Sequence, residues 1–288
     1  MLNTSLEHTI IPTNGIKLHV VLAGPPGGEP VVLLHGFPEF WRGWLNQIEI
    51  LANQGYRVIV PDQRGYNLSD VPSKVQDYYL DRLSADVVGL MDHFGIEKVN
   101  LVGHDWGAAV AWNLGMYFPE RIRKLGILNV PHMSVMRRFL SKSPRQMLKS
   151  WYIGFFQIPK LADWLLSRNN FSATLAMLKS SSLPTTFTPT DLNEYRQAYT
   201  NSHGLTGMIN WYRALARYRP PAPKSIWLEM PVLILWGKHD VALSPEMATA
   251  SLKLCDQGEL FFFENATHWV QHDEPQAVSD HLIKFFKK

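Results

Sequence analysis

The sequence has few of the features that would tie it to a special environment. Its 288 residues include a single cysteine, Cys255, which excludes an internal disulfide and agrees with a reducing compartment. No apolar run approaches the roughly 20 residues that a membrane-spanning helix needs. The segment from Met1 to His8 lacks the basic and apolar regions of a signal peptide. We therefore expect a soluble, cytoplasmic protein without a membrane span.

Charge of one sign is also scarce. The net charge of +3 is small for this length and demands no acidic partner. Basic residues are densest from 137 to 149, where they alternate with apolar side chains. These apolar side chains are Phe139, Leu140, Met147 and Leu148. The pattern predicts helix with one solvated and one buried face, and it argues against nucleic-acid binding.

The sequence does contain the alternation of an α/β protein. Its 46% hydrophobic and 18% charged residues are typical of a globular chain. In the first 130 residues, short β-branched runs alternate with helical patterns, notably Asp81 to Phe94. The runs span residues 16–22, 31–34, 56–60, 99–102 and 125–130. Repeated strand–helix–strand order predicts a mostly parallel sheet flanked by helices.

This alternation stops after Pro131 and resumes at Pro231. The residues in between are rich in aromatic side chains, Met, Arg and Ser, with helical spacing and no clear strand. Strands at 232–236 and 260–263 and a helix at 275–286 then complete the pattern. We predict a core domain of residues 1–130 and 230–288, with residues 131–229 inserted as a helical cap over the carboxyl edge of the sheet.

The segment from Gly103 to Gly107 reads Gly-His-Asp-Trp-Gly. It follows an apolar strand and precedes a run suited to a helix. In a Gly-x-nucleophile-x-Gly motif, small flanking residues permit a strained turn that pushes the nucleophile into a site. Asp105 stands where an esterase carries serine, which nearly excludes a serine esterase and predicts a carboxylate nucleophile. The alternative is that Asp105 only caps the following helix.

A nucleophilic carboxylate needs a base for the second half of its reaction, and the base needs an acid to orient it. Asp240 and His268 follow successive predicted strands, in the chain order of nucleophile, acid and histidine. We expect the three side chains to meet at one edge of the sheet. Alternatively, Asp240 only forms a turn, and His268 is one surface histidine among eleven.

Two further patterns bear on the site. His268 and His272 stand four residues apart, a spacing that could chelate a metal on a helix. No other acidic or histidine ligand follows at helical spacing, so we expect no metal; we also expect no cofactor. Phe37 and Pro38 end a motif that follows the predicted strand at 31–34. In enzymes with a Gly-x-nucleophile-x-Gly turn, the loop at this position supplies half of the oxyanion hole. We predict that the amides of Phe37 and Trp106 form that hole. Pro38 is a candidate for a cis peptide bond. The alternative is that this segment is an ordinary turn.

Four segments together resemble the α/β-hydrolase-fold epoxide hydrolases, over nearly the whole chain. They are residues 35–41 (His-Gly-Phe-Pro-Glu-Phe-Trp), 62–70 (Asp-Gln-Arg-Gly-Tyr-Asn-Leu-Ser-Asp), 104–107 (His-Asp-Trp-Gly) and 267–269 (Thr-His-Trp). The resemblance implies the α/β-hydrolase fold and conversion of epoxides to vicinal diols through an ester on Asp105. Water activated by His268 and Asp240 would hydrolyse this ester. Many family members carry glycine at the position of Asn67, but asparagine tolerates the left-handed conformation.

The resemblance also implies two tyrosines in the cap, and the matching positions are Tyr152 and Tyr212. A phenol with a pKa of about 10 is able to hydrogen-bond the epoxide oxygen and protonate it. The alternative is that the two aromatic rings only pack the cap.

Apolar side chains favour a small apolar epoxide as substrate, with water as the second reactant. The predicted substrate contacts are Phe37, Trp106, Phe155, Phe156, Trp211, Met177 and Met208. Several of the cap residues could instead form the cap core. A haloalkane or haloacid dehalogenase with the same nucleophile stays open, although haloalkane enzymes usually carry asparagine at the position of Phe37. A non-catalytic hydrolase-fold receptor also stays open. We expect a monomer or homodimer.

Overall fold

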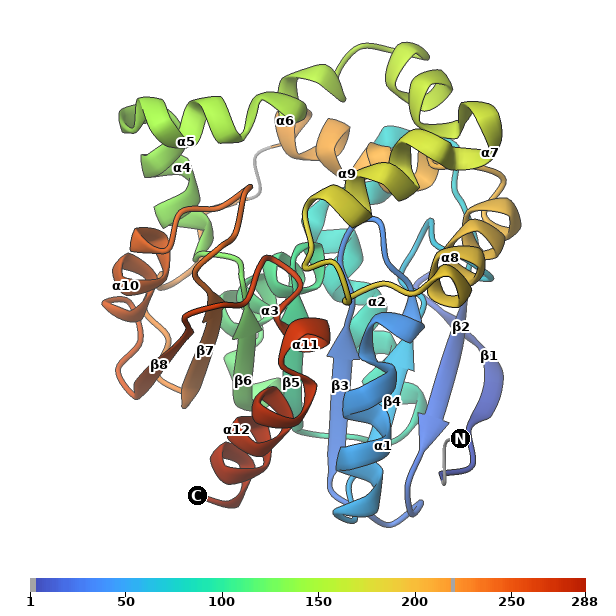
Figure 1. Ribbon diagram of the computed structural model, residues 1–288. Helices are drawn as coiled ribbons and strands as arrows, with labels where there is room; N and C mark the ends of the chain where they lie inside the picture. Colours follow the sequence, from blue (N-terminus) through green and yellow to red (C-terminus); the bar gives the residue numbers. More distant parts are fainter. Residues whose placement is uncertain (1–3, 219–220) are drawn as a thin grey trace.

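The computed structural model describes residues 4–218 and 221–288. Within these residues, eight strands form one sheet in the order β1-β2-β4-β3-β5-β6-β7-β8 (Figure 1). The strands β3 to β8 run parallel, whereas β2 is antiparallel to β1 and β4. The strands are β1 (Glu7–Thr13), β2 (Ile16–Ala23), β3 (Pro30–Leu34), β4 (Arg57–Pro61), β5 (Val99–His104), β6 (Ile122–Leu128), β7 (Val232–Gly237) and β8 (Gly258–Phe263). The predicted mostly parallel sheet is confirmed.

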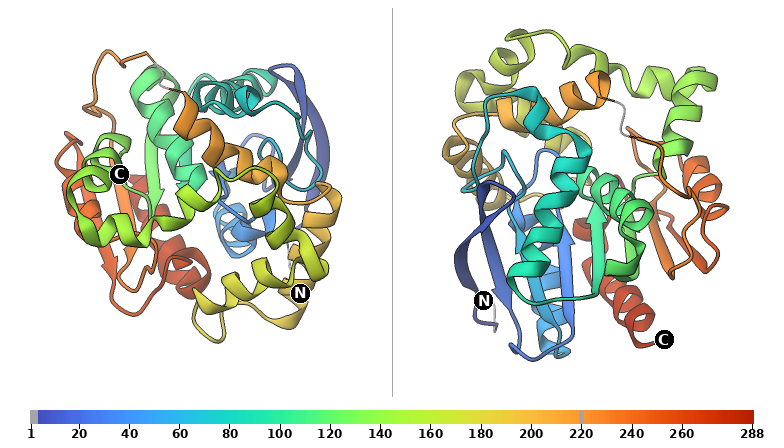
Figure 2. Two further views of the ribbon diagram at one scale, coloured as in Figure 1. Left: turned by 90° about the horizontal axis from the view of Figure 1, so that it is seen from above. Right: turned by 180° about the vertical axis from the view of Figure 1, so that it is seen from behind.

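Helices cover both faces of this sheet. The helices α1 and α12 lie on one face, and α2 and α3 lie on the other (Figures 1 and 2). The α-helices outside the segment between β6 and β7 are α1 (Leu45–Asn53), α2 (Leu80–His93), α3 (Trp106–Tyr117), α10 (Glu246–Leu252), α11 (Val270–Asp273) and α12 (Pro275–Lys287). The short 3₁₀ helices are η1 (Trp41–Trp44), η2 (Val75–Tyr78) and η3 (Pro119–Arg121). The core domain is therefore a three-layer α/β arrangement.

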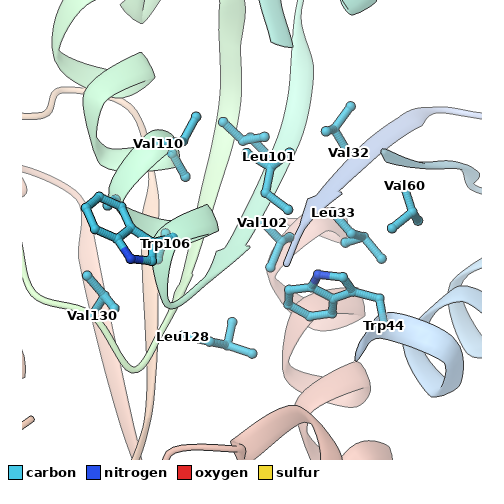
Figure 3. Close-up of a cluster of buried hydrophobic side chains, with 14 of the residues drawn as sticks. Val32, Leu33, Trp44, Val60, Leu101, Val102, Trp106, Val110, Leu128 and Val130 are labelled. Carbon is cyan, nitrogen blue, oxygen red and sulfur yellow. The ribbon is translucent and has the colours of Figure 1, made fainter. Parts of the chain in front are cut away.

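The main core lies between the central strands and these helices. The strands β3, β5 and β7 are buried along nearly their whole length, as expected when both faces of a parallel sheet are covered. Figure 3 shows the side chains of Leu33 and Val102 among this apolar cluster, with Trp106 beside Val130. Because Trp106 directly follows Asp105, the apolar core extends to the carboxyl edge of the sheet.

The described residues between β6 and β7 form helices and no named strand. These helices are α4 (Met133–Lys142), α5 (Pro144–Lys149), α6 (Trp151–Phe155), α7 (Leu161–Ser180), α8 (Pro189–Asn201) and α9 (Thr206–Arg217), with a non-helical interruption of α7 at residues 168–171. They lie over the carboxyl edge of the parallel strands (Figure 1). We keep the name cap for residues 131–229. Residues 1–3 of the predicted core and 219–220 of the cap lie outside the described residues.

Two strand predictions were incomplete. The edge strand β1 was missed, although it pairs with β2 across Asn14 and Gly15, which have φ values of 46° and 76°. Asn-Gly between extended runs signals a two-residue hairpin, so β1 was predictable. The strand β6 begins at Ile122 and not at Leu125. Charged side chains obscured its start, among them Lys124, which donates hydrogen bonds to backbone carbonyls of α12.

The basic stretch at 137–149 is helical, but part of its predicted buried face was wrong. Met147 and Leu148 are 53% and 75% exposed. The fully buried residue of α5 is Gln146, whose amide Nε2 donates to the carbonyl of Ala242 at 2.8 Å. Its Oε1 accepts from the hydroxyl of Ser244 at 2.9 Å. This short helix is therefore oriented by one buried, hydrogen-bonded amide and not by its apolar side chains.

In residues 4–218 and 221–288, every helix is too short or too polar to cross a bilayer.

Candidate active site

Asp105 lies at the turn between β5 and α3. Its φ of +48° and ψ of −122° place it in a region that residues other than glycine rarely adopt. A Cβ atom on Gly103 would lie 2.3 Å from the carbonyl oxygen of Gly107. A Cβ on Gly107 would lie 2.1 Å from the carbonyl oxygen of Leu34. The two glycines are thus required for a strained turn that presents Asp105 at the carboxyl edge of the sheet.

The carboxylate of Asp105 does not cap α3. Asp105 occupies the N-cap position, but its side chain makes no capping hydrogen bond. Its Oδ1 instead accepts a hydrogen bond of 2.7 Å from the backbone N–H of Phe37, and its Oδ2 lies 3.5 Å from Nε2 of His268. This geometry contradicts the capping alternative. Among the described residues, no hydrogen bond joins the amide of Trp106 to the carboxylate of Asp105, so the part of Trp106 in an oxyanion hole stays a prediction. The peptide bond between Phe37 and Pro38 is cis.

His268 and Asp240 form a buried pair beside Asp105. The Nδ1 atom of His268 lies 2.7 Å from Oδ2 of Asp240. Asp240 follows β7 and also accepts hydrogen bonds from the side chain of Asn129 at 2.8 Å and from the amide of Leu243 at 2.8 Å. Asn129, at the end of β6, was missed by the sequence analysis, although its place at the carboxyl edge was a usable signal. The three predicted residues therefore meet, and Asp240 is also held by Asn129 and by the amide of Leu243 in its own loop.

Charges in this group stabilise one another. Burial alone would lower the pKa of His268, but the negative charges of Asp240 and Asp105 raise it to about 10. Burial opposes ionisation of the carboxylates, yet the charge of His268 and its hydrogen bonds lower the pKa values of Asp105 and Asp240. At neutral pH, the resting site thus holds an imidazolium between two carboxylates.

Tyr152 and Tyr212 come together from two different helices, α6 and α9. Their ring centroids lie 5.9 Å apart. The ring of Tyr212 packs edge-on against Phe37 at 5.3 Å and Trp106 at 4.9 Å. Burial and the negative charge of Asp105 raise the pKa of both phenols. Both hydroxyls are therefore protonated at neutral pH and are available as hydrogen-bond donors.

A cavity of about 60 Å³ lies beside Asp105 and is lined by Trp106, Tyr152 and Tyr212. The rest of its lining is apolar and was not predicted. These residues are Ala109, Val130, Pro131, Met133, Met136, Ile153, Leu215 and Leu243. Several of them follow β6 or β7 or lie at the start of α4, so the carboxyl edge of the sheet was the signal that could have identified them.

The remaining predicted substrate contacts do not line this cavity. They are Phe37, Phe155, Phe156, Met177, Met208 and Trp211. Phe156 and Phe37 pack against the ring of Tyr212, with centroid distances of 4.8 and 5.3 Å. Trp211 is buried, and its indole N–H donates to the carbonyl of Arg64 at 3.0 Å. Met208 is also fully buried. Phe37, Phe156 and Trp211 thus pack against aromatic rings of the cavity wall, and the contact of all six residues with substrate stays a prediction.

Comparisons with known proteins identify the family. The family model described as the alpha/beta hydrolase fold matches residues 29–275. Epoxide hydrolase 4 of Mus musculus is 35% identical over 284 residues, which cover 96% of this chain and 78% of that protein. This chain belongs to the α/β-hydrolase family of epoxide hydrolases. The AB hydrolase superfamily protein YfhM of Bacillus subtilis is 43% identical over 275 residues, covering 96% of each protein.

Solved structures of epoxide hydrolases are also similar to this one. A mutant of the epoxide hydrolase from Bacillus megaterium superposes with a TM-score of 0.90 at 30% identity, covering 97% of this chain and 100% of that chain. The resemblance inferred from four short segments is therefore confirmed for the fold and the family.

One departure from the epoxide hydrolase family, Asn67, preserves its turn. Its φ is 45°, as asparagine permits. Its side-chain amide donates to the carboxylate of Asp62 at 2.7 Å, and its side-chain oxygen accepts from Asn201 at 2.8 Å. Because Asn201 lies in α8, this substitution also joins the core loop to the cap.

Glu39, which lies in the segment 35–41 and was not predicted to have a role, is the centre of a buried network. Its fully buried carboxylate lies 3.0 Å from Nδ1 of His104 and 2.7 Å from Nε2 of His272. It also accepts a hydrogen bond of 2.8 Å from the hydroxyl of Tyr195 in the cap. Burial opposes ionisation, but His272 and His104 hold the pKa of Glu39 far below its usual range. The sequence carried no signal for this convergence, since the partners come from distant segments.

The spacing of His268 and His272 does not produce a metal centre. His272 faces Glu39, whereas His268 lies between Asp240 and Asp105. In the part of the chain that the structure describes, no three His, Cys, Asp or Glu side chains are placed to hold a metal ion.

Proposed function

We propose that this protein hydrolyses a small apolar epoxide to a vicinal diol through an ester on Asp105. The observation that carries the proposal is one apolar cavity lined by a carboxylate and two protonated phenols, Asp105, Tyr152 and Tyr212. Opening a strained ether requires a nucleophile at carbon and an acid at oxygen, and this arrangement supplies both. Membership of the epoxide hydrolase family supports the same reaction.

In the first step, Oδ2 of Asp105 attacks an epoxide carbon. Its Oδ1 is already bound to the amide of Phe37 at 2.7 Å, which leaves Oδ2 as the reacting atom. The carbon–oxygen bond of the ring breaks, and the oxygen takes a proton from Tyr152 or Tyr212. The products are an ester, in which Oδ1 is the carbonyl oxygen, and a tyrosinate.

Formation of the ester changes the charge beside His268. The carboxylate of Asp105 raises the pKa of His268 in the resting site, so esterification of Asp105 lowers that pKa. The proton released from His268 neutralises the tyrosinate. His268 is then a neutral imidazole, as a general base must be.

In the second step, His268 takes a proton from water, and the hydroxide attacks the carbonyl carbon of the ester. Asp240, 2.7 Å from Nδ1, stabilises the imidazolium that forms. The amide of Phe37, joined by that of Trp106, donates to the developing oxyanion at Oδ1. Collapse breaks the ester bond, and the diol oxygen takes the proton from His268. The carboxylic acid left on Asp105 returns its proton to His268, which restores the resting imidazolium, so the net reaction is epoxide plus water to diol.

The substrate class follows from the cavity lining. Apart from Asp105 and the two phenols, the lining consists of apolar side chains such as Met133, Met136 and Leu243, together with the indole of Trp106. A charged substituent would lose its hydration there without a compensating partner. We infer aryl or alkyl epoxides as substrates.

The test is a single turnover of an aryl epoxide by excess enzyme in ¹⁸O-labelled water, followed by mass analysis of the diol and of the Asp105 peptide. The ester route places unlabelled oxygen in the first diol and the label in Asp105. Label in that diol with an unlabelled Asp105 would mean direct attack by water and would overturn the ester. Release of halide from haloalkanes without diol formation would favour a dehalogenase, and ligand binding without turnover would favour a receptor.

A further inference from the structure

The cap segment from α5 to the start of α7 carries a concentration of exposed apolar side chains. Among the described residues, twelve large hydrophobic side chains are exposed, and six of them lie between residues 147 and 164. They are Met147 (53% exposed), Leu148 (75%), Trp151 (67%), Ile158 (45%), Leu161 (41%) and Trp164 (57%). Single exposed apolar residues are ordinary, but clustered ones mark an interaction surface. We call these six residues the apolar strip.

The apolar strip belongs to the outermost layer of the molecule. It runs through α5, α6 and the start of α7, which lie at the top of Figure 1 and nearest the viewer in the left panel of Figure 2. Within α6, Trp151 faces solvent while the next residue, Tyr152, lines the cavity beside Asp105. One short helix, α6, therefore carries both a member of the strip and a residue of the candidate active site.

The surroundings of the apolar strip are strongly cationic. Residues 131–180 contain eight basic side chains and one acidic side chain, Asp163. Asp163 is neutralised by Arg213 at 2.5 Å. Arg145 has a distant acidic partner, Glu246 at 3.8 Å, and both side chains are exposed. In the described residues of this segment, the exposed cations without an acidic side chain within 4.0 Å include Arg138, Lys142, Lys160 and Arg168.

We propose that the apolar strip and its surrounding cations bind the surface of an anionic lipid bilayer. Tryptophan and aliphatic side chains insert at the level of the headgroups, and Lys and Arg side chains attract anionic lipids. Both groups lie in the consecutive cap helices α4 to α7 and the turns between them. The guanidinium of Arg168 lies 4.7 Å from the ring centroid of Trp164, which places a cation directly on an apolar member of the strip.

Charge complementarity decides between this occupant and the alternatives. A second copy docked through the same face would bring two cationic surfaces together. Nucleic acid would use aromatic rings for base stacking, but four of the six exposed side chains, Met147, Leu148, Ile158 and Leu161, are not aromatic. An anionic bilayer satisfies the aliphatic and the cationic side chains together. Binding to a bilayer would also place the cap next to the lipid, in which apolar epoxides concentrate.

The test is flotation of the full chain with vesicles and without epoxide, so its result does not depend on the proposed function. The vesicles contain phosphatidylcholine alone or with about one third phosphatidylglycerol, and we expect binding only to the anionic vesicles, weakened by salt. The double variant Leu148→Ser/Trp151→Ser should bind at least about tenfold more weakly. The variant Arg138→Glu/Lys142→Glu should show a similar loss.

The matched control is Ile10→Ser/Phe261→Ser, which removes two side chains that are 50% and 42% exposed and lie outside the cap. It should bind vesicles as the parent protein does. Circular dichroism establishes that each variant is folded. Three results would overturn the proposal. They are no binding to anionic vesicles, an equal loss of binding in the control variant, or self-association or binding of single-stranded DNA that Leu148→Ser/Trp151→Ser weakens to the same extent.

Discussion

The Nε2 atom of His104 lies 2.9 Å from the backbone carbonyl oxygen of His268, 164 residues further along the chain. His104 immediately precedes Asp105, so the neighbour of the proposed nucleophile contacts the proposed base. Its other ring nitrogen faces the buried carboxylate of Glu39 at 3.0 Å. The relative placement of Asp105 and His268 therefore depends on a buried polar network shared by two loops.

Neutralising the centre of this network should destabilise the protein. We expect Glu39→Gln to lower the free energy of unfolding by about 3–5 kcal/mol, because His104 and His272 lose a buried anionic partner. Urea unfolding at pH 7 measures this change. Glu97→Gln is the matched control, because Glu97 is exposed. Equal stability of the two variants would show that the network contributes little.

The strained turn at Asp105 should tolerate no side chain on its glycines. Gly107→Ala places a Cβ atom 2.1 Å from the carbonyl oxygen of Leu34, and we expect a loss of stability of at least about 1–3 kcal/mol. A Cβ on Gly154 in α6 would meet no atom within 4 Å. Gly154→Ala should therefore leave stability unchanged or raise it by about 0.5–1 kcal/mol. Urea unfolding of both variants tests the contrast, which fails if Gly107→Ala is as stable as the parent.

Removing the base should trap the ester. His268→Gln should form the adduct on Asp105 but lower the rate of its hydrolysis by about 10²–10⁴-fold. Intact mass spectrometry would then detect an increase equal to the mass of one epoxide, located on the peptide containing Asp105. His93→Gln, at an exposed histidine, should accumulate no adduct. Full turnover by His268→Gln would remove this residue from the second step.

Tyr152 and Tyr212 should both contribute to ester formation, the first step of the proposed reaction. Tyr152→Phe and Tyr212→Phe should each slow ester formation by about 10²-fold, and the double variant should be slower still. Single-turnover kinetics measures this step directly. Tyr79→Phe is the control, because the Tyr79 ring stacks on Tyr218 at 4.0 Å and does not line the cavity beside Asp105. Unchanged ester formation in the double variant would reduce both residues to packing.

The stability of the protein should fall as the pH rises above neutrality. The pKa of His268 is raised from 6.5 to about 10 in the folded protein. A raised pKa contributes stability that is complete below pH 6.5 and is lost between pH 6.5 and 10. Asp240→Asn removes one charge that raises this pKa, so the decline over that window should flatten. Urea unfolding of both proteins at several pH values tests this, and parallel curves would contradict a role for Asp240 in holding the imidazolium.

Local patterns in the sequence determined the strand–turn–helix at Asp105, most of the sheet and the meeting of Asp105, Asp240 and His268. Steric limits on a turn act between near neighbours, and parallel strands end at one edge of a sheet, so both are predictable from chain order. The edge strand β1 is equally local, because Asn14 and Gly15 form the hairpin turn that joins it to β2.

Only the tertiary structure decided which atoms of Asp105 face Phe37 and His268, which residues converge on Glu39, and which apolar side chains line the cavity. It also decided that Gln146 turns inward while Leu148 faces solvent. Periodicity defines the faces of a helix but not the partner that each face meets. Those partners come from distant parts of the chain, and the energy of a buried polar group depends on finding them.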